Sequence, residues 1–284
     1  MYLKLITPSG FCMGVERAIS MLDDLVNNNP DKKIYCLHEI VHNPNVVDYF
    51  KNKWVVFIND FSEIYKKNCI LAFSAHWINK FTLEKTAKEY DQVVNLECPL
   101  VTKVYNEAKM FVQEWRTIFY IWKKGHQEAE QVVEFVKDLW WKVCIFLKED
   151  EIPQLDKNEK IAIVNQTTLN YKYILDLIEK IKQKYPDTKS IWNSDICKAT
   201  FDRQSALKNE LDNIDLLIVI WWKNSSNTKE LVKIWENAGK EVIFIQSASE
   251  LENIKIDKSK KIWITAGAST PTDEIYKAAN LIKN

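Results

Sequence analysis

Residues 3–27 read LKLITPSGFCMGVERAISMLDDLVN. A short apolar run opens this stretch, Pro8 and Gly10 interrupt it, and an amphipathic segment follows over residues 14–27. The apolar side chains of that segment recur near one face of a helix: Val15, Ala18, Ile19, Leu22, Leu25 and Val26. The stretch predicts a strand, a loop and a helix in that order, which is the building unit of α/β folds.

The same alternation continues along the chain. We expect strands at residues 3–7, 33–37, 54–58, 69–74, 117–122, 142–147, 160–164, 215–220, 241–245 and 261–265. We expect helices at residues 14–27, 43–52, 80–89, 100–114, 127–138, 171–184, 203–212 and 228–238. Strands that alternate with helices favour parallel sheets, so the predicted fold class is α/β.

Bulk composition limits the partners. The chain has 284 residues, and its 39 Lys and Arg balance 39 Asp and Glu, so the net charge is zero. A balanced charge argues against bulk attraction to nucleic acid or to an anionic membrane. The sequence has no apolar run of about 18 residues, and residues 1–6 are too short for a signal peptide. We therefore expect a cytoplasmic protein with reduced cysteines and neither a nucleic-acid nor a membrane partner.

Three of the six cysteines share one setting. Cys12, Cys98 and Cys197 each follow an extended stretch and precede a predicted helix, about one in each third of the chain. At a helix N-terminus, the macrodipole and the free amide groups favour the thiolate that binds metal. The recurrence predicts three α/β domains, each bringing one cysteine to a shared centre: residues 1–95, 96–192 and 193–284.

Three thiolates can hold a [4Fe–4S] cluster through three irons and leave the fourth iron open to substrate. The competing interpretation is three unrelated buried cysteines, because a free cysteine packs as a small hydrophobe. We accept that interpretation for Cys36, Cys69 and Cys144, which lie within apolar strands.

Histidines and short polar side chains follow the predicted strands, where α/β proteins place ligand-binding loops. Imidazoles can bind phosphate or transfer protons, and hydroxyl and amide groups beside a helix N-terminus suit an oxyanion. Satisfied histidines, helix caps and turns are the competing interpretation, because they use the same residues. The segments are His42, His76, His126 and residues 165–169, 224–228 and 266–271.

Together these segments resemble one family, the 4-hydroxy-3-methylbut-2-enyl diphosphate reductases, which catalyse the last step of the non-mevalonate isoprenoid pathway. The matching motifs occur in the family's order, and they include Ser-Ala-His at 74–76 and Asn-Ser-Ser-Asn-Thr at 224–228. The other motifs lie at residues 10–19, 38–44, 98–104, 124–128, 166–169, 196–204 and 265–269.

The resemblance implies a trefoil of three α/β domains around a central iron–sulfur cluster. The implied cluster ligands are Cys12, Cys98 and Cys197. The implied catalytic residues are Glu128 for proton delivery, Thr167 beside the substrate hydroxyl, and His126. The implied substrate-binding residues are His42, His76, His126, Thr167, Thr168, Ser225, Ser226, Asn227 and Ser269.

The activity implied by the resemblance is reductive removal of a hydroxyl group from a small allylic diphosphate. Ferredoxin or flavodoxin supplies two electrons in this family, and the products are isopentenyl and dimethylallyl diphosphates. A carboxylic acid must supply the proton that lets the oxygen leave as water. One alternative is a non-catalytic iron–sulfur sensor or decayed relative. Another is a zinc protein, although the cysteines lack the paired spacing of structural zinc sites.

Tryptophan stands where the family pattern has glycine. The chain has five glycines and eleven tryptophans, whereas average usage predicts roughly twenty glycines. We hypothesise that many of these residues are glycine in the native protein, through a UGA codon read as glycine in the cell. The competing interpretation is that the tryptophans are real and pack aromatic surface. An indole is expected to clash or to fill the pocket at Trp77, Trp122, Trp221, Trp222 and Trp263.

Acidic residues also depart from the family pattern beside two cysteines. Glu97 precedes Cys98, and Asp195 lies two residues before Cys197, where the family usually has threonine. These changes leave the candidate ligands intact and are expected to tune the surroundings of the cluster.

Overall fold

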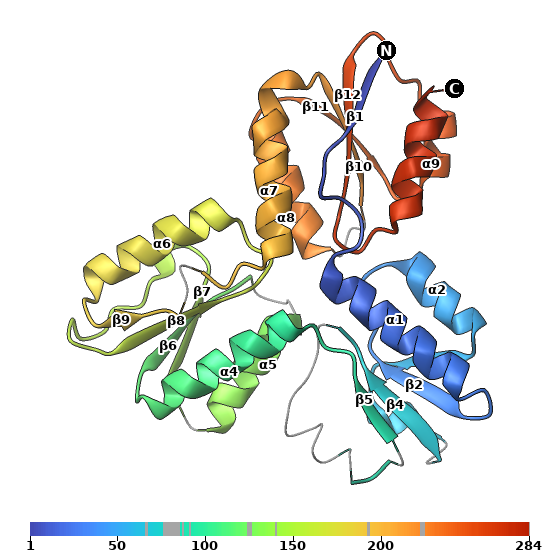
Figure 1. Ribbon diagram of the computed structural model, residues 1–284. Helices are drawn as coiled ribbons and strands as arrows, with labels where there is room; N and C mark the ends of the chain where they lie inside the picture. The colour runs from blue at the N-terminus through green and yellow to red at the C-terminus, as the bar shows by residue number, and fades with distance from the viewer. Residues whose placement is uncertain are drawn as a thin grey trace. The chain divides into compact units, whose positions relative to one another are not determined.

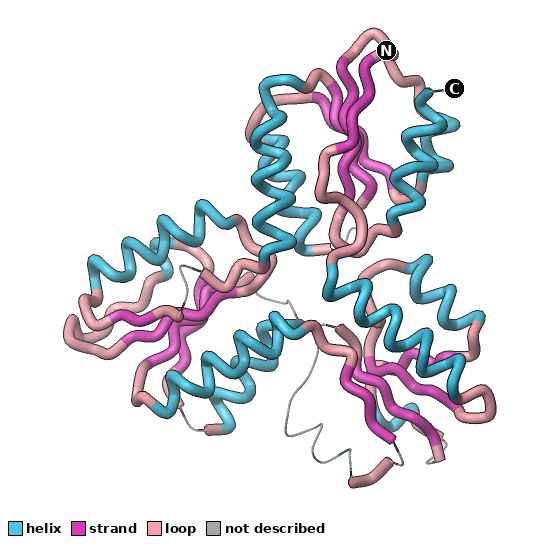
Figure 2. Tube along the Cα trace, in the orientation of Figure 1, coloured by secondary structure: helices cyan, strands magenta, loops and turns pink. Residues whose placement is uncertain are grey.

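The computed structural model contains three four-stranded sheets, and helices cover them (Figures 1 and 2). It describes residues 1–65, 68–75, 86, 88–90, 92–123, 127–139, 141–191, 194–221 and 225–283, with only the backbone of residues 127–131. Every described strand pair is parallel. The predicted α/β fold class is therefore confirmed.

The chain divides into two compact units. Unit 1 comprises Met1–Glu16 and Cys197–Asn284, and unit 2 comprises Arg17–Ile196. The predicted division into three domains at residues 95 and 192 stays a prediction.

Unit 1 is built on one sheet with the strand order β1-β12-β10-β11. Its first strand pairs with its last, and Tyr2 lies opposite Lys261. The strands are β1 (Tyr2–Leu5), β10 (Leu216–Ile220), β11 (Glu241–Ile245) and β12 (Lys261–Ala266). The helices are α7 (Lys198–Glu210), α8 (Ser226–Glu236), α9 (Thr272–Lys283) and the first residues of α1 (Met13–Asn28).

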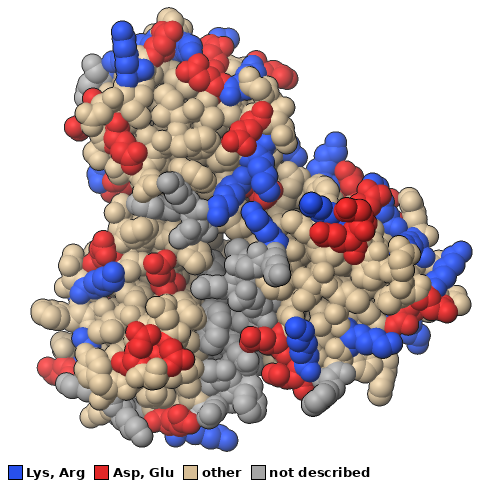
Figure 3. All heavy atoms as spheres, turned by 180° about the vertical axis from the view of Figure 1, so that it is seen from behind, with Lys and Arg blue, Asp and Glu red and all other residues tan. Residues whose placement is uncertain are grey.

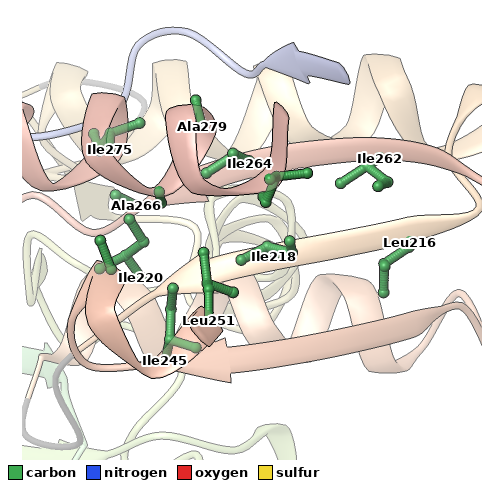
Figure 4. Packing of buried hydrophobic residues seen from close by; sticks show 13 residues of the cluster. Leu216, Ile218, Ile220, Ile245, Leu251, Ile262, Ile264, Ala266, Ile275 and Ala279 are labelled. Carbon is green, nitrogen blue, oxygen red and sulfur yellow. The ribbon is translucent and has the colours of Figure 1, made fainter. Parts of the chain in front are cut away.

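The central strand β10 is buried on both faces, because alternate side chains of a strand point to opposite faces. On one face, Ile218 packs in a cluster with Ile275 of α9 (Figure 4). On the other face, Leu217 packs with Trp263 of β12 and Trp235 of α8. This double burial explains why the strand is a continuous apolar run in the sequence.

Unit 2 contains two sheets, with the strand orders β3-β2-β4-β5 and β7-β6-β8-β9. The first has β2 (Lys33–Leu37), β3 (Val55–Ile58), β4 (Cys69–Phe73) and β5 (Gln92–Asn95), with α2 (Pro44–Asn52) between β2 and β3. The second has β6 (Thr117–Ile121), β7 (Val143–Phe146), β8 (Ile161–Asn165) and β9 (Thr188–Lys189). Its helices are α4 (Pro99–Gln113), α5 (Gln127–Asp138) and α6 (Tyr171–Lys184).

Helices cover both faces of the second sheet as well. On one face, Ile118 of β6 packs with Phe111 of α4 and Val136 of α5. On the other face, Phe119 packs with Leu177 of α6. The two sequence-adjacent residues of β6 therefore belong to different cores, as the period of two in a strand requires.

Acidic and basic side chains lie interspersed over the face shown in Figure 3, in line with the net charge of zero. Without a broad field of one sign, a bound anion must be held by local donors. Within the described part of the chain, no helix is long and apolar enough to cross a membrane.

Candidate functional site

The candidate loops follow the two central strands of each sheet. In the first sheet of unit 2, β2 leads to the edge strand β3 and β4 leads to the opposite edge strand β5. In the second sheet, β6 leads to β7 and β8 leads to β9 in the same way. In unit 1, β10 and β12 are the equivalent central pair. Parallel sheets bind ligands outside the carboxyl ends of the strands at such switch points. The candidates follow these strands in the sequence: His42, His76, His126, Thr167, Thr168, Ser225, Ser226, Asn227 and Ser269.

Some of the predicted residues lie outside the described part of the chain. These are His76, His126, Trp77 and Trp222. Glu128 lies in the first turn of α5, of which only the backbone is described. The predicted roles of His76, His126 and Glu128 therefore stay predictions.

In unit 1, the N-terminus of α8 presents short polar side chains. Ser225 is the N-cap, and its Oγ accepts hydrogen bonds from the backbone N of Thr228 at 3.4 Å and from Thr228 Oγ1 at 2.9 Å. Asn227 is only 4% exposed, and neither its Oδ1 nor its Nδ2 has a partner among the residues that the structure describes. Burying an amide without hydrogen bonds costs about 1–3 kcal/mol, so this side chain indicates a polar ligand.

The loop after β12 runs against this helix N-terminus. A Cβ placed on Gly267 would lie 1.9 Å from Thr228 Oγ1 and 3.6 Å from Ser225 Oγ, so the close approach requires glycine. Ser269, two residues further on, is buried. The backbone N of Cys12 donates to the oxygen of Ala268 at 3.1 Å. Unit 1 therefore brings a candidate cluster ligand next to the loop that carries a candidate phosphate-binding serine.

A buried arginine lies near the two cysteines of unit 1. Cys12 and Cys197 lie at the N-termini of α1 and α7, where the oxygen of Cys12 accepts from the N of Glu16 and Cys197 is the N-cap. Arg203 donates through Nη2 to the oxygen of Gly10 at 2.6 Å. Burial lowers the pKa of Arg203, and the sulfurs of Cys12 and Cys197 oppose that shift. A buried cation of this kind favours thiolates in its surroundings.

In unit 2, backbone hydrogen bonds join the loops after β2, β4 and β5. Cys98, the N-cap of α4, donates through its N to the oxygen of Ala75 at 2.8 Å. Ala75 in turn donates through its N to the oxygen of Ile40 at 3.3 Å. His42 follows in the same loop as Ile40, half-buried, with its Nδ1 3.5 Å from Glu39 Oε2. Cys98 and His42 therefore belong to neighbouring loops at the same end of one sheet.

The loop after β8 is held by the side chain of Gln166. Its Nε2 donates to Thr168 Oγ1 at 2.9 Å, and its Oε1 accepts from the backbone N of Lys123 at 3.2 Å. Thr167 lies between Gln166 and Thr168 in the sequence, and its side chain is buried. The loops after β6 and β8 are thereby fixed together.

A buried charge cluster lies beside the start of α4, and it was not predicted from the sequence. Lys103 Nζ lies 3.1 Å from Glu107 Oε1 and 3.3 Å from Asp195 Oδ1. Asp195 and Asn165 exchange two hydrogen bonds, from each backbone N to the other's side-chain oxygen, at 3.0 and 2.9 Å. Burial raises the pKa of Glu107 to about 8, the carboxylate of Asp195 acts in the same direction, and Lys103 opposes both.

This cluster borders a cleft of about 490 Å³ that Arg17, Glu97 and Thr102 also line. The available sequence signals were the spacing of Lys103 and Glu107 by one helical turn and the unusual Asp195. Neither signal shows that Asp195 meets α4.

The three candidate cluster ligands are chemically suited to iron–sulfur binding. All three cysteines lie at helix N-termini, and thiolates are the ligands that iron–sulfur clusters use. Among the described side chains, no three His, Cys, Asp or Glu residues gather as a metal site. Cys12 and Cys197 belong to unit 1 and Cys98 to unit 2. By contrast, Cys36 lies in β2, and burial raises the pKa of its thiol, in line with a structural role.

Two of the described tryptophans pack without the clash that was expected. Trp263 is buried in the core of unit 1, and its Nε1 donates to Glu210 Oε2 at 3.1 Å. Trp221 packs on Phe244 with a ring-centroid distance of 5.2 Å. The expected clash is wrong at these two positions, because each indole packs against apolar neighbours; the alternative, that an indole fills the pocket, stays a prediction. Trp122 is buried, and its Nε1 has no partner among the described side chains, which is a cost to the fold.

The chain is similar to known proteins over its whole length. The model of the LytB protein family matches residues 3–283. The 4-hydroxy-3-methylbut-2-enyl diphosphate reductase of Neorickettsia sennetsu is 34% identical and covers all of this chain and 92% of its own. The 4-hydroxy-3-methylbut-2-enyl diphosphate reductase 1 of Rhodopseudomonas palustris is 35% identical, and the match covers 98% of this chain and 91% of the relative's chain.

Solved structures agree with this result. The E-1-hydroxy-2-methyl-but-2-enyl-4-diphosphate reductase from Plasmodium falciparum has a TM-score of 0.90 at 31% identity, covering 100% of this chain and 88% of its own. An (E)-4-hydroxy-3-methyl-but-2-enyl diphosphate reductase, described as the terminal enzyme of the non-mevalonate pathway, has a TM-score of 0.72 at 28% identity, covering 100% and 99%. This chain belongs to the LytB family.

Proposed function

We propose that the chain is a cytoplasmic 4-hydroxy-3-methylbut-2-enyl diphosphate reductase. The reaction breaks the carbon–oxygen bond of the allylic hydroxyl, consumes two electrons and two protons, and releases water with isopentenyl or dimethylallyl diphosphate. Ferredoxin or flavodoxin supplies the electrons. The observation that carries the proposal is Asn227 at the N-terminus of α8, which is buried and whose two amide atoms have no partner in the described part of the chain.

The diphosphate binds where the loops after β10 and β12 meet. Asn227 supplies its Nδ2 as a hydrogen-bond donor, and Ser225, Ser226 and Ser269 supply hydroxyl groups from the same two segments. The positive end of the α8 dipole favours an anion there. Neutral donors of this kind hold the anion without a general positive field, which fits the net charge of zero.

Cys12, Cys98 and Cys197 would hold a [4Fe–4S] cluster through their thiolates. When bound, the cluster supplies electrons and a Lewis acid to the leaving hydroxyl. The hydrogen bond from Cys12 to Ala268 keeps one ligand beside the Ser269 segment, so the bound diphosphate is oriented relative to that ligand.

The remaining residues act on the hydroxyl group and its proton. Thr167 binds the substrate hydroxyl, and Glu128, with His126 nearby, delivers the proton that lets the oxygen leave as water. The bond from Gln166 to Thr168 keeps the loop that carries Thr167 in place. His42, His76 and Thr168 complete the substrate contacts.

The competing function is a non-catalytic iron–sulfur sensor. A sensor requires only the three cysteines and has no use for a desolvated amide side chain. The unpaired Asn227 therefore favours the reductase.

The test is substrate-dependent oxidation of a reduced dye by the anaerobically reconstituted protein. We expect turnover, and a loss of about 100-fold or more in Asn227→Ala, comparable to the loss of one preorganised hydrogen-bond donor in other enzymes. Asn237→Ala is the matched control, because this residue is the exposed C-cap of the same helix. A bound cluster without turnover, or equal activity in both variants, would contradict the proposal.

A further inference from the structure

The ends of α2 and α4 carry tryptophan in a backbone conformation that favours glycine. Trp54 has a φ of +67° and Trp115 a φ of +59°. Each follows the C-cap of its helix, Lys53 in α2 and Glu114 in α4. Bulky side chains rarely adopt this left-handed region, because the Cβ crowds the following carbonyl oxygen.

The hydrogen bonds define the turn at each helix end. After α4, the N of Trp115 donates to the oxygen of Val112 at 3.0 Å, and the N of Arg116 donates to the oxygen of Phe111 at 3.1 Å. These two bonds make a Schellman motif, which places its left-handed residue where Trp115 stands. After α2, the N of Trp54 donates to the oxygen of Lys51 at 2.9 Å, the equivalent of the first bond.

Little of either indole is buried, and Trp115 meets the ring of Trp141 edge-on at a centroid distance of 5.2 Å. Trp54 is 81% exposed and Trp115 is 75% exposed, so most of each side chain faces water. The chain uses glycine for the same purpose elsewhere: after α8, Gly239 has a φ of +64°, and its N donates to the oxygen of Glu236 at 3.0 Å.

We infer that residues 54 and 115 are glycine in the native protein. The observation is local backbone geometry and does not depend on the proposed function. It agrees with five glycines against eleven tryptophans in the whole chain. UGA codons at these positions explain both facts. The cell would read them as glycine, whereas translation with a genetic code that assigns UGA to tryptophan gives tryptophan.

Not every tryptophan belongs to this group. Trp235 lies within α8, is fully buried, and donates through Nε1 to the oxygen of Glu241 at 3.1 Å. Nothing in the backbone at this position calls for glycine. The inference is therefore limited to the two exposed, left-handed positions.

The test is mass spectrometry of the protein purified from its native cells. Trypsin releases residue 54 in the peptide 54–66 and residue 115 in the peptide 110–116. A recombinant chain made with tryptophan at both positions provides the reference masses. We expect both native peptides at the glycine mass, and a tryptophan mass at either position would overturn the inference there.

The gene gives an independent reading. We expect UGA at both codons, because only that codon changes meaning between glycine and tryptophan. UGG at codon 54 or 115 would overturn the inference for that residue even if the peptide escaped detection.

Discussion

Units 1 and 2 carry similar parallel sheets, but they form their turns with different residues. Four of the five glycines lie in unit 1, and unit 2 contains only Gly125. In unit 1, Cβ atoms on Gly10 and Gly267 would lie 2.8 and 1.9 Å from threonine hydroxyls, so glycine stands where the backbone requires it. In unit 2, the left-handed helix ends carry Trp54 and Trp115 instead.

The two units also differ in how they hold their candidate loops. In unit 1, the loops around Ser225 and Gly267 are held by neutral hydrogen bonds and close packing. In unit 2, the segment before Cys197 is held by Asp195, whose charge is shared with Lys103 and Glu107. The difference indicates that pH and charge variants affect unit 2 more, whereas changes of side-chain volume affect unit 1 more.

Removing a candidate cysteine ligand gives the largest expected effect, and the effect is expected to be the same in both units. Cys197→Ser in unit 1 and Cys98→Ser in unit 2 are each expected to lower dye oxidation by more than about 100-fold, since even outer-shell partners of metal sites contribute 10–100-fold. Iron and sulfide content per chain is the second measurement. Cys36→Ala, at a fully buried cysteine, is the control and keeps the cluster. Full iron content in Cys98→Ser would show that unit 2 supplies no ligand there.

Removing the cation of the buried cluster tests the charged character of unit 2. Lys103→Met leaves Glu107 and Asp195 facing each other, and we expect it to lower the free energy of unfolding by about 2 kcal/mol. This is less than for a fully buried pair, because the Lys103 side chain is 32% exposed. Urea unfolding measures it, with Lys109→Met on the exposed face of α4 as control. Equal losses in both variants would refute the role of the cluster.

The same cluster predicts a pH dependence. The pKa of Glu107 is about 8 in the folded protein, because burial and then Asp195 raise it from an ordinary value of 4.5, against the effect of Lys103. The folded state therefore binds a proton that the unfolded chain releases, and its stability falls as pH rises between these values. Glu107→Gln is expected to flatten the dependence of the urea midpoint between pH 5 and pH 8. An unchanged slope would assign the dependence to other groups.

The sequence predicts those strands that lie in continuous apolar runs. Strand β6 was expected at residues 117–122 and spans Thr117–Ile121. Strands β5 and β9 were missed, because their residues, QVVN and TK, include at most two apolar side chains. Helix α9 was missed although Ile275, Ala278, Ala279 and Ile282 recur at helical spacing after Pro271. That helix was open to prediction from its periodicity and its preceding proline.

The candidate site residues that directly follow a central strand could be predicted from the sequence. His42, Thr167 and Ser225 follow central strands, so the sequence places them at the ends of the sheets. The contact of Gly267 with Thr228 and the pairing of Lys103 with Asp195 join segments far apart in the chain, and no local pattern encodes them. The accommodation of Trp263 likewise depends on which residues pack beside β12.

Exchanging glycine and tryptophan at the left-handed helix ends gives the smallest expected effect. It tests directly whether the two units differ in the residues that form their turns. Trp54→Gly and Trp115→Gly are each expected to raise the free energy of unfolding by about 1 kcal/mol, because the left-handed conformation then carries no Cβ. Gly239→Trp is expected to lower it by a similar amount. A Cβ at Gly239 would meet no described atom within 4 Å, so the loss of stability is expected to be conformational rather than steric.

Trp235→Gly separates this effect from ordinary packing. That residue is fully buried, and its loss is expected to cost about 3 kcal/mol or more. Urea midpoints of the four variants provide the comparison. If Trp54→Gly and Trp115→Gly were also destabilising, the exposed indoles would be contributing to the stability of the fold. Tryptophan and glycine would then be two stable ways to end a helix, and the tryptophans would not be filling positions that require glycine.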